Sequence, residues 1–70
     1  MKNDSVVMYV DGGSRGNPGP AGIGVVILSQ DGKKLKEVWE YIGEATNNIA
    51  EYSALLRGLE EACIFGNVIV

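Results

Sequence analysis

The chain has 70 residues, 46% hydrophobic and 21% charged, which suits one small globular domain with a marginal core, because so short a chain buries only about 60% of its unfolded surface. The net charge of −3 excludes a broad basic surface for gripping phosphates, but not a site in which metal ions carry the positive charge. Histidine is absent and cysteine occurs once, which excludes zinc clusters, histidine-dependent triads and an intrachain disulfide.

The sequence shows no targeting or membrane-spanning segment. Its first residues, MKNDSVV, lack the long apolar stretch of a secretory signal, and no run approaches the roughly 18 apolar residues of a membrane span. A single cysteine is typical of a protein in a reducing compartment. We therefore expect a soluble, cytoplasmic protein with no membrane partner, formed by one domain over residues 1–70.

The first predicted element is a strand over residues 5–11. Its apolar side chains occupy both faces, so the strand should be central in a sheet and covered on both sides. Residues 12–20 follow as a predicted loop, because glycine and proline dominate them. Five of the ten glycines fall between residues 12 and 22, so glycine has a local purpose here.

Two further strands are predicted. Along residues 21–29, Gly22 and Gly24 fall on one face, where something should approach the backbone closely. The Asp-Gly pair in residues 30–33 predicts a hairpin turn, and residues 35–43 form a third strand whose mixed charges indicate a sheet edge. Three strands joined in this way make an antiparallel meander.

The apolar spacing then changes to that of a helix over residues 48–65. The apolar positions that define it are Tyr52, Leu55, Leu56, Leu59, Ala62 and Cys63. Its stripe centres between Leu55 and Leu59. Capping side chains are available at both ends: Thr46, Asn47 and Asn48 before the helix, Gly66 and Asn67 after it.

Residues 68–70 begin a last apolar strand. A helical crossover would place this strand parallel to a neighbour in the sheet. The predicted fold class is therefore α/β, with the order β-β-β-α-β.

Glu51 has two interpretations. As part of Asn48-x-x-Glu51 it forms a capping box, in which its carboxylate reaches back to the backbone amide of the N-cap residue. It also lies only about 80° from the centre of the apolar stripe, whereas Arg57 and Glu61 lie opposite the stripe. The second interpretation directs Glu51 toward the rim of the sheet at the start of the helix.

Asp11 has two interpretations as well. Asp-Gly is a turn signal in its own right, but a two-residue turn does not explain the nine-residue loop that follows. The end of the first strand and the start of the helix can lie close together, which would bring Asp11 near Glu51. A hard cation such as Mg²⁺ is the simplest way to stabilise two such carboxylates.

The glycine loop is either a flexible connector or a binding surface. It lacks the ending of a P-loop and the third glycine of a dinucleotide-binding motif. Its exposed backbone groups suit a sugar-phosphate backbone or a 2′-hydroxyl better than a base.

Two segments together are more specific than any single residue. YVDGGSRGNPGPAGIGVVI followed by ATNNIAEYSALLRGLEEA resembles the N-terminal half of a type 1 ribonuclease H, from Val6 to the end of the chain. The resemblance implies a ribonuclease H-like fold. It also implies hydrolysis of the RNA strand of RNA–DNA hybrids, with two Mg²⁺ ions, or Mn²⁺, as cofactors.

The same resemblance implies roles for individual residues. Asp11 and Glu51 match two catalytic, metal-binding carboxylates of the family. A second set matches positions that contact the hybrid: Gly12, Gly13, Ser14, Arg15, Gly16, Asn17, Thr46, Asn47 and Asn48. Glu44 departs from the pattern, because several family members carry an arginine there beside a phosphate of the DNA strand.

The family has four metal-binding carboxylates, and two of them have no counterpart in these 70 residues. We therefore expect little turnover from this chain alone, and activity when it pairs with a C-terminal half. One alternative is a self-associating half-domain, because one helix covers one face only and the last strand offers a free edge. Another is a kinase- or actin-like ATPase, which also uses an Asp-Gly-rich hairpin against phosphate.

Overall fold

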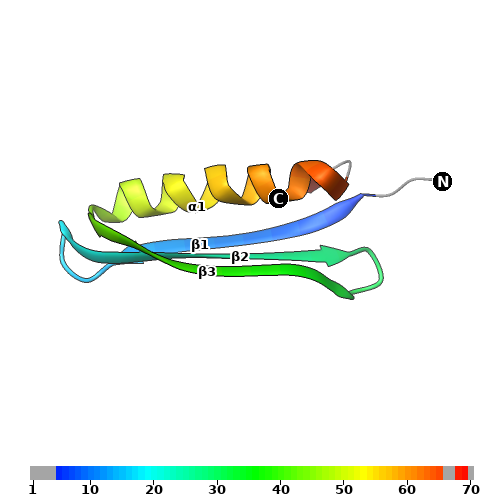
Figure 1. The fold of residues 1–70 in the computed structure, drawn as a ribbon, viewed down its shortest axis with the longest axis horizontal. Helices are drawn as coiled ribbons and strands as arrows, with labels where there is room; N and C mark the ends of the chain where they lie inside the picture. The colour runs from blue at the N-terminus through cyan, green and yellow to red at the C-terminus, as the bar shows by residue number, and fades with distance from the viewer. Residues whose placement is uncertain (1–4, 66–67, 70) are drawn as a thin grey trace.

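The computed structural model describes residues 5–65 and 68–69. Within them, one helix lies across one face of a four-stranded sheet (Figure 1). The strands are β1 (Val6–Ser14), β2 (Gly19–Ser29), β3 (Lys34–Ala45) and β4 (Val68–Ile69). The helix α1 (Asn47–Ala62) continues as a short 3₁₀ turn, η1 (Cys63–Phe65). The predicted α/β order β-β-β-α-β is confirmed.

The sheet has the strand order β3-β2-β1-β4. β1, β2 and β3 pair antiparallel, and β4 pairs parallel to β1 through Val6 and Val7. The predicted meander, the edge position of the third strand and the parallel last strand are all confirmed. Beyond Val7, that edge of β1 has no partner strand among the described residues.

The predicted loop over residues 12–20 is too long. β1 continues to Ser14, which pairs with Ala21, and β2 begins at Gly19, so the connection spans only residues 15–18. Gly12 and Gly13 are thus strand residues. Glycine content misled the prediction, because these glycines serve a close approach by the helix and not a turn.

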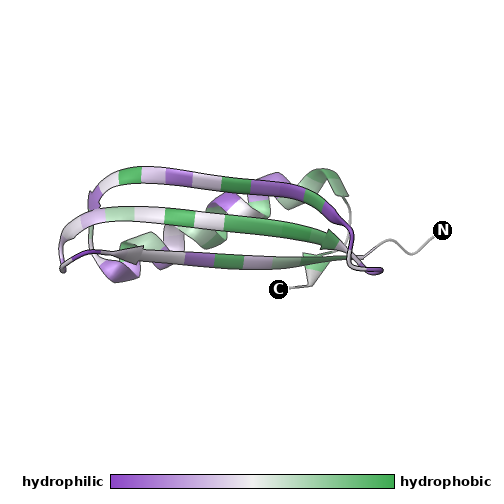
Figure 2. Cartoon of the chain, turned by 90° about the horizontal axis from the view of Figure 1, so that it is seen from below, coloured by the Kyte–Doolittle hydropathy of each residue, from purple (hydrophilic) through white to green (hydrophobic). Residues whose placement is uncertain are grey.

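The helix covers one face of the sheet, and the other face is open in the described part of the chain. Figure 2 views that open face, with α1 behind the three long strands. Tyr9, Trp39 and Tyr41 are 60%, 68% and 69% exposed there. The expectation that the first strand is covered on both sides is therefore wrong for the residues described.

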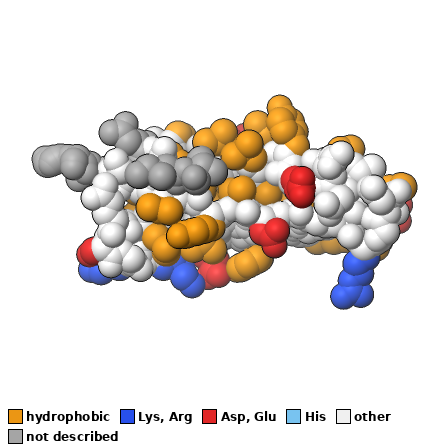
Figure 3. Space-filling view, turned by 180° about the vertical axis from the view of Figure 1, so that it is seen from behind, with side chains coloured by type: hydrophobic (Ala, Val, Ile, Leu, Met, Phe, Trp, Pro, Cys, Tyr) orange, Lys and Arg blue, Asp and Glu red, His pale blue; other side chains and the backbone are white. Residues whose placement is uncertain are grey.

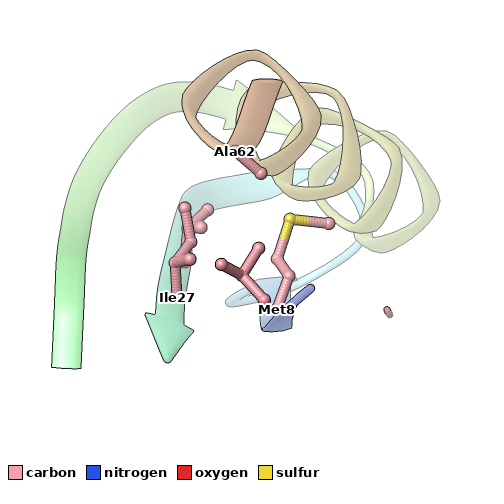
Figure 4. Close-up of a cluster of buried hydrophobic side chains, with 5 residues drawn as sticks. Met8, Ile27 and Ala62 are labelled. Carbon is pink, nitrogen blue, oxygen red and sulfur yellow. The ribbon is translucent and has the colours of Figure 1, made fainter. Parts of the chain in front are cut away.

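α1 rests on the sheet through small residues. Its buried positions are Ala50, Ala54, Gly58 and Ala62, spaced four residues apart. A Cβ at Gly58 would lie 2.7 Å from Met8 Sδ and 2.8 Å from Val10 Cγ1, so the helix backbone lies very close to β1. The core beneath contains Met8, Ile27 and Ala62 (Figure 4).

The predicted apolar stripe is therefore wrong in its centre. Leu55 packs against the core, but Leu56 and Leu59 are 46% and 43% exposed and Tyr52 is 63% exposed. Small residues allow the closest approach to the sheet, so they form the contact face and the bulky residues lie to its side.

The predicted capping of the helix is confirmed at its start, where Thr46 was one of three candidates, and the end differs from the prediction. Thr46 is the N-cap, and its side chain accepts a hydrogen bond from Ile49 N at 3.2 Å. The Asn48-x-x-Glu51 capping box does not form, because the helix already begins at Asn47. At the other end Cys63 is the C-cap, while Gly66 and Asn67 lie outside the described residues. No described helix is long and apolar enough to cross a membrane.

Candidate metal and nucleic-acid site

Asp11 lies inside β1 and not in a turn. It pairs with Gly24 of β2, and three further residues of β1 continue the ladder after it. Its side chain is exposed. The turn interpretation of Asp11 is therefore wrong, and the aspartate needs another explanation.

Gly12 brings the start of the helix onto β1. A Cβ at this position would lie 2.2 Å from the carbonyl oxygen of Ala50 and 2.9 Å from the amide nitrogen of Glu51. Only glycine fits such a contact without moving backbone. The residue that follows Asp11 thus touches the residue that carries the second carboxylate.

Glu51 lies on the flank of α1 that faces away from β3. It comes three residues before the buried Ala54, and Arg57 comes three residues after it, so the two lie about 60° to either side of the buried face. Arg57 contacts Glu40 of β3. Glu51 therefore lies over the edge of β1 that has no described partner beyond Val7.

The positive charges of Arg57 in the helix and Lys36 in β3 are paired with other residues. Arg57 pairs with Glu40 and, at 2.9 Å, with Glu61, and Lys36 lies 3.2 Å from Glu61. The hydrogen bond from Arg57, followed by that from Lys36, lowers the pKa of Glu61. The same pairing with Glu61 raises the pKa of Arg57. Arg57 and Glu61 thus bridge to β3, although the sequence placed them opposite the sheet.

Asp11 and Glu51 are in no ion pair among the described residues, and both are exposed. Two carboxylates at a sheet edge, without a Lys or Arg partner, are the oxygen ligands that Mg²⁺ prefers. No group of three candidate metal ligands occurs in the part of the chain that the structure describes. The chemistry of these two carboxylates fits part of the ligand set of a divalent ion.

The short loop is tied to the helix start by two asparagines. Asn17 Oδ1 accepts a hydrogen bond from Asn47 N at 3.0 Å, and Asn47 Oδ1 accepts one from Ser14 N at 3.2 Å. Asn47 Nδ2 lies 3.5 Å from Glu51 Oε2. We call Asn17, Asn47 and these contacts the asparagine bridge. It joins the predicted loop residues, the predicted helix-start residues and Glu51 in one network.

The other predicted contact residues surround this bridge. Gly13 lies against it, since a Cβ there would be 3.3 Å from Asn47 Oδ1. Gly16 has a φ of +89° and its carbonyl accepts a hydrogen bond from the Ser14 hydroxyl. Arg15 and Asn48 are exposed on either side.

The structure also shows a surface that sequence reasoning missed. A broad, open groove runs over the uncovered sheet face from Asp11 and Gly13 to Trp39 and Tyr41. Within it, the indole of Trp39 lies over Gly24, where a Cβ would meet the ring at 2.3 Å, as the expected close approach to this strand face required. The sequence feature that could have revealed the groove is the pair Gly22 and Gly24 on one strand face, since large aromatic residues of β3 pair with them.

The strand order, and a helix start that rests on the first strand beside an exposed aspartate, define a ribonuclease H-like α/β domain. The profile of the RNase H family matches residues 3–70. The chain belongs to the RNase H family. This assignment excludes the kinase- or actin-like alternative.

Individual relatives agree with the family match. Ribonuclease HI of Halobacterium salinarum is 57% identical over 58 residues, which are 83% of this chain and 29% of that protein. The crystal structure of RNase H1 from Halobacterium salinarum NRC-1 has a TM-score of 0.83 at 55% identity, over 89% of this chain and 47% of that one. The crystal structure of LC11-RNase H1 in complex with an RNA/DNA hybrid has a TM-score of 0.81 at 61% identity, over 87% and 44%. The chain thus spans less than half the length of these relatives.

Proposed function

We propose that this chain supplies part of the active site of a ribonuclease H, which hydrolyses the RNA strand of RNA–DNA hybrids. The observation that carries the proposal is the backbone contact at Gly12, which brings the strand of Asp11 and the helix of Glu51 together. The similar LC11-RNase H1, whose structure contains an RNA/DNA hybrid, supports the choice of substrate.

In this proposal Asp11 and Glu51 would hold the metal ions, and Glu51 would also face the RNA strand. When bound, Mg²⁺ or Mn²⁺ supplies positive charge at the scissile phosphate and at the leaving oxygen. The exposure of both carboxylates and their lack of a described cationic partner leave their oxygens available for this role. The two residues set where along the nucleic acid the phosphate is held.

The hybrid-binding surface in this proposal is the region around the asparagine bridge. Its strand and loop part comprises residues 12–17, and its helix part comprises residues 46–48. Backbone groups and side-chain amides here suit the 2′-hydroxyls and the minor groove of the RNA strand. Thr46 would hold a phosphate of the DNA strand, where Glu44 replaces an arginine common in the family and weakens the grip.

Two carboxylates carry too little negative charge for two divalent ions, so we propose that further ligands come from another segment or chain. The isolated 70 residues should bind Mg²⁺ weakly and turn over little. Cys63, exposed and unpaired, supports a reducing compartment such as the cytoplasm as the place of action.

A chimera tests the function. Residues 1–70 replace the matching part of the Halobacterium salinarum ribonuclease HI, and cleavage of an RNA–DNA hybrid is measured with Mg²⁺. The chimera should cleave the hybrid, and Asp11→Asn should reduce the rate at least about 100-fold while hybrid binding persists. Unchanged cleavage by the Asp11→Asn chimera would show that Asp11 is not a metal ligand.

A second candidate function is that of a self-associating half-domain. The observation that favours it is the exposure of large apolar side chains on both outer surfaces, the sheet face and the helix flank. Figure 3, a view from behind, shows hydrophobic side chains in several groups on that side of the molecule. Light scattering at tens of micromolar tests this candidate, and a clean monomer would count against it.

A further inference from the structure

We infer that Asn47 is a positioning residue, which holds the Glu51 carboxylate in a fixed relation to the short loop after β1. The inference rests on the proposed function, in which Glu51 is a metal ligand. It gives Asn47 a task inside the protein, in addition to any contact with nucleic acid. Three contacts meet at this residue, and they come from the end of β1, from the loop and from α1.

The orientation of the Asn47 amide follows from its partners. Its Oδ1 accepts the hydrogen bond from Ser14 N at 3.2 Å, a task that the amide nitrogen cannot perform. Nδ2 therefore faces the other way, toward Glu51 Oε2 at 3.5 Å. A flipped amide would direct its NH₂ group at the Ser14 N–H and its oxygen at the carboxylate, which sets donor against donor and acceptor against acceptor. The Ser14 N–H thus fixes the orientation of the Asn47 amide in which Nδ2 faces Glu51.

The backbone of Asn47 fixes the loop at a second point. Asn47 N is the first amide of α1 and has no partner within the helix. Asn17 Oδ1 accepts its hydrogen bond at 3.0 Å. The four-residue connection between β1 and β2 is therefore tied to one residue at two points, Ser14 just before it and Asn17 within it.

Packing limits the freedom of the Asn47 side chain. A Cβ at Gly13 would lie 3.3 Å from Asn47 Oδ1, so the amide lies directly against the strand. Glu51 follows Asn47 by one helical turn, and side chains at this spacing are neighbours on a helix surface. A displacement of the loop is thus passed through a single packed amide to the carboxylate. The loop that would touch the RNA and the carboxylate that would hold the ion move as one unit.

Two variants distinguish the role of Oδ1 from that of Nδ2 in the Asn47 side chain. Asn47→Ala removes the acceptor for Ser14 N–H and the donor toward Glu51. Asn47→Asp keeps an oxygen acceptor for Ser14 N–H but replaces the donor with a negatively charged oxygen. Asn48→Ala is the matched control, because it makes the same change one residue further along the first turn of α1 without touching the bridge.

The measurements use the full 70-residue chain without metal or nucleic acid. NMR gives the hydrogen exchange rate of the Ser14 amide and the three-bond couplings that define the Glu51 side-chain conformation. In Asn47→Ala, Ser14 exchange should rise at least about fivefold and the Glu51 couplings should become those of a freely averaging side chain. In Asn47→Asp, Ser14 exchange should stay near the wild-type rate while the Glu51 couplings average, and Asn48→Ala should change neither.

Unchanged Glu51 couplings in Asn47→Ala overturn the inference. If Asn47→Ala does not fold, Asn47→Asp decides, and a Glu51 side chain that keeps its wild-type couplings there overturns it too. Neither measurement involves cleavage, so the inference can fail while the chimera still cleaves the hybrid. Conversely, an inactive chimera would leave the result for Asn47 intact as a statement about the fold.

Discussion

Replacement of Gly12 by alanine tests the central contact between helix and sheet. The added Cβ would lie 2.2 Å from Ala50 O and 2.5 Å from Ala50 C, whereas ordinary contacts of a Cβ begin near 3.4 Å. Both atoms belong to the helix backbone, so no side-chain rotation can relieve the overlap. The start of α1 must rise from β1 by roughly 1 Å, which opens the packing at Ala50 and Ala54.

The cost of Gly12→Ala follows from the size of this displacement. Overpacking a tight core costs about 1–3 kcal/mol, and a backbone overlap belongs at the upper end of that range. At about 4–8 °C per kcal/mol for a domain of this size, the melting temperature should fall by more than about 10 °C. Because Glu51 would move with the helix backbone, the chimera that carries Gly12→Ala should also cleave the hybrid more slowly.

Thermal and urea denaturation monitored by circular dichroism measure the effect. Gly22→Ala is the matched control, since its Cβ would lie 3.4 Å from Glu40 O, an ordinary contact in the neighbouring strand. We expect the control to remain within about 1 kcal/mol of the wild type. A melting temperature for Gly12→Ala equal to that of Gly22→Ala would refute the close approach of α1 to β1.

Three further changes have directions that the structure sets. Thr46→Ala removes the acceptor for Ile49 N and should lower the free energy of unfolding, measured by thermal denaturation, by about 1 kcal/mol. Thr46→Ser should restore most of this loss. Full stability without the hydroxyl would show that the cap does not stabilise the helix. Gly58→Ala gains about 1 kcal/mol of helix propensity, but its Cβ would overlap the side chains of Met8 and Val10. We therefore expect urea denaturation to show a net loss of about 1 kcal/mol in the free energy of unfolding. A gain in stability would mean that these two side chains move aside freely. Because the pKa of Glu61 is lowered in the folded state, its contribution is complete above the usual carboxylate pKa of 4.5 and is lost as the pH falls through the lowered value. Stability measured against pH should therefore fall less steeply in acid for Glu61→Gln than for Glu60→Gln, and identical slopes would contradict the ion pairs on this helix.

The order of the elements was predictable because each has a clear local pattern. The Asp-Gly hairpin turn, the alternation in β3 and the change to helical spacing all depend on neighbouring residues. The length of the loop after β1 was not predictable in this way. Gly12 and Gly13 look like loop residues locally, and only the helix that crosses them explains why a paired strand contains them.

The contact face of the helix was hidden for a related reason. Hydrophobic periodicity weights large residues, so it placed the stripe between Leu55 and Leu59, while Ala50, Ala54 and Gly58 form the actual contact. The distance between the helix backbone and the sheet decides which residues form the contact face, and the helix sequence alone does not reveal that distance. That Asp11 and Glu51 hold a metal ion together stays a prediction from the family pattern, and the placement of Glu51 on the flank of the helix is consistent with it.

The distribution of large side chains bears on how the site is held in place. The largest fully buried side chains are Met8, Ile27 and Val25, while Trp39, Tyr41 and Tyr52 are more than 60% exposed. Fully burying a large apolar side chain contributes about 1.5–3 kcal/mol, so this chain leaves much of its hydrophobic stabilisation unused. The contacts at Gly12 and the asparagine bridge therefore depend on a thin core, to which the helix contributes small residues. A partner that covered the open sheet face or the helix flank would add burial of these side chains, and so would stabilise the contact at Gly12 without touching it.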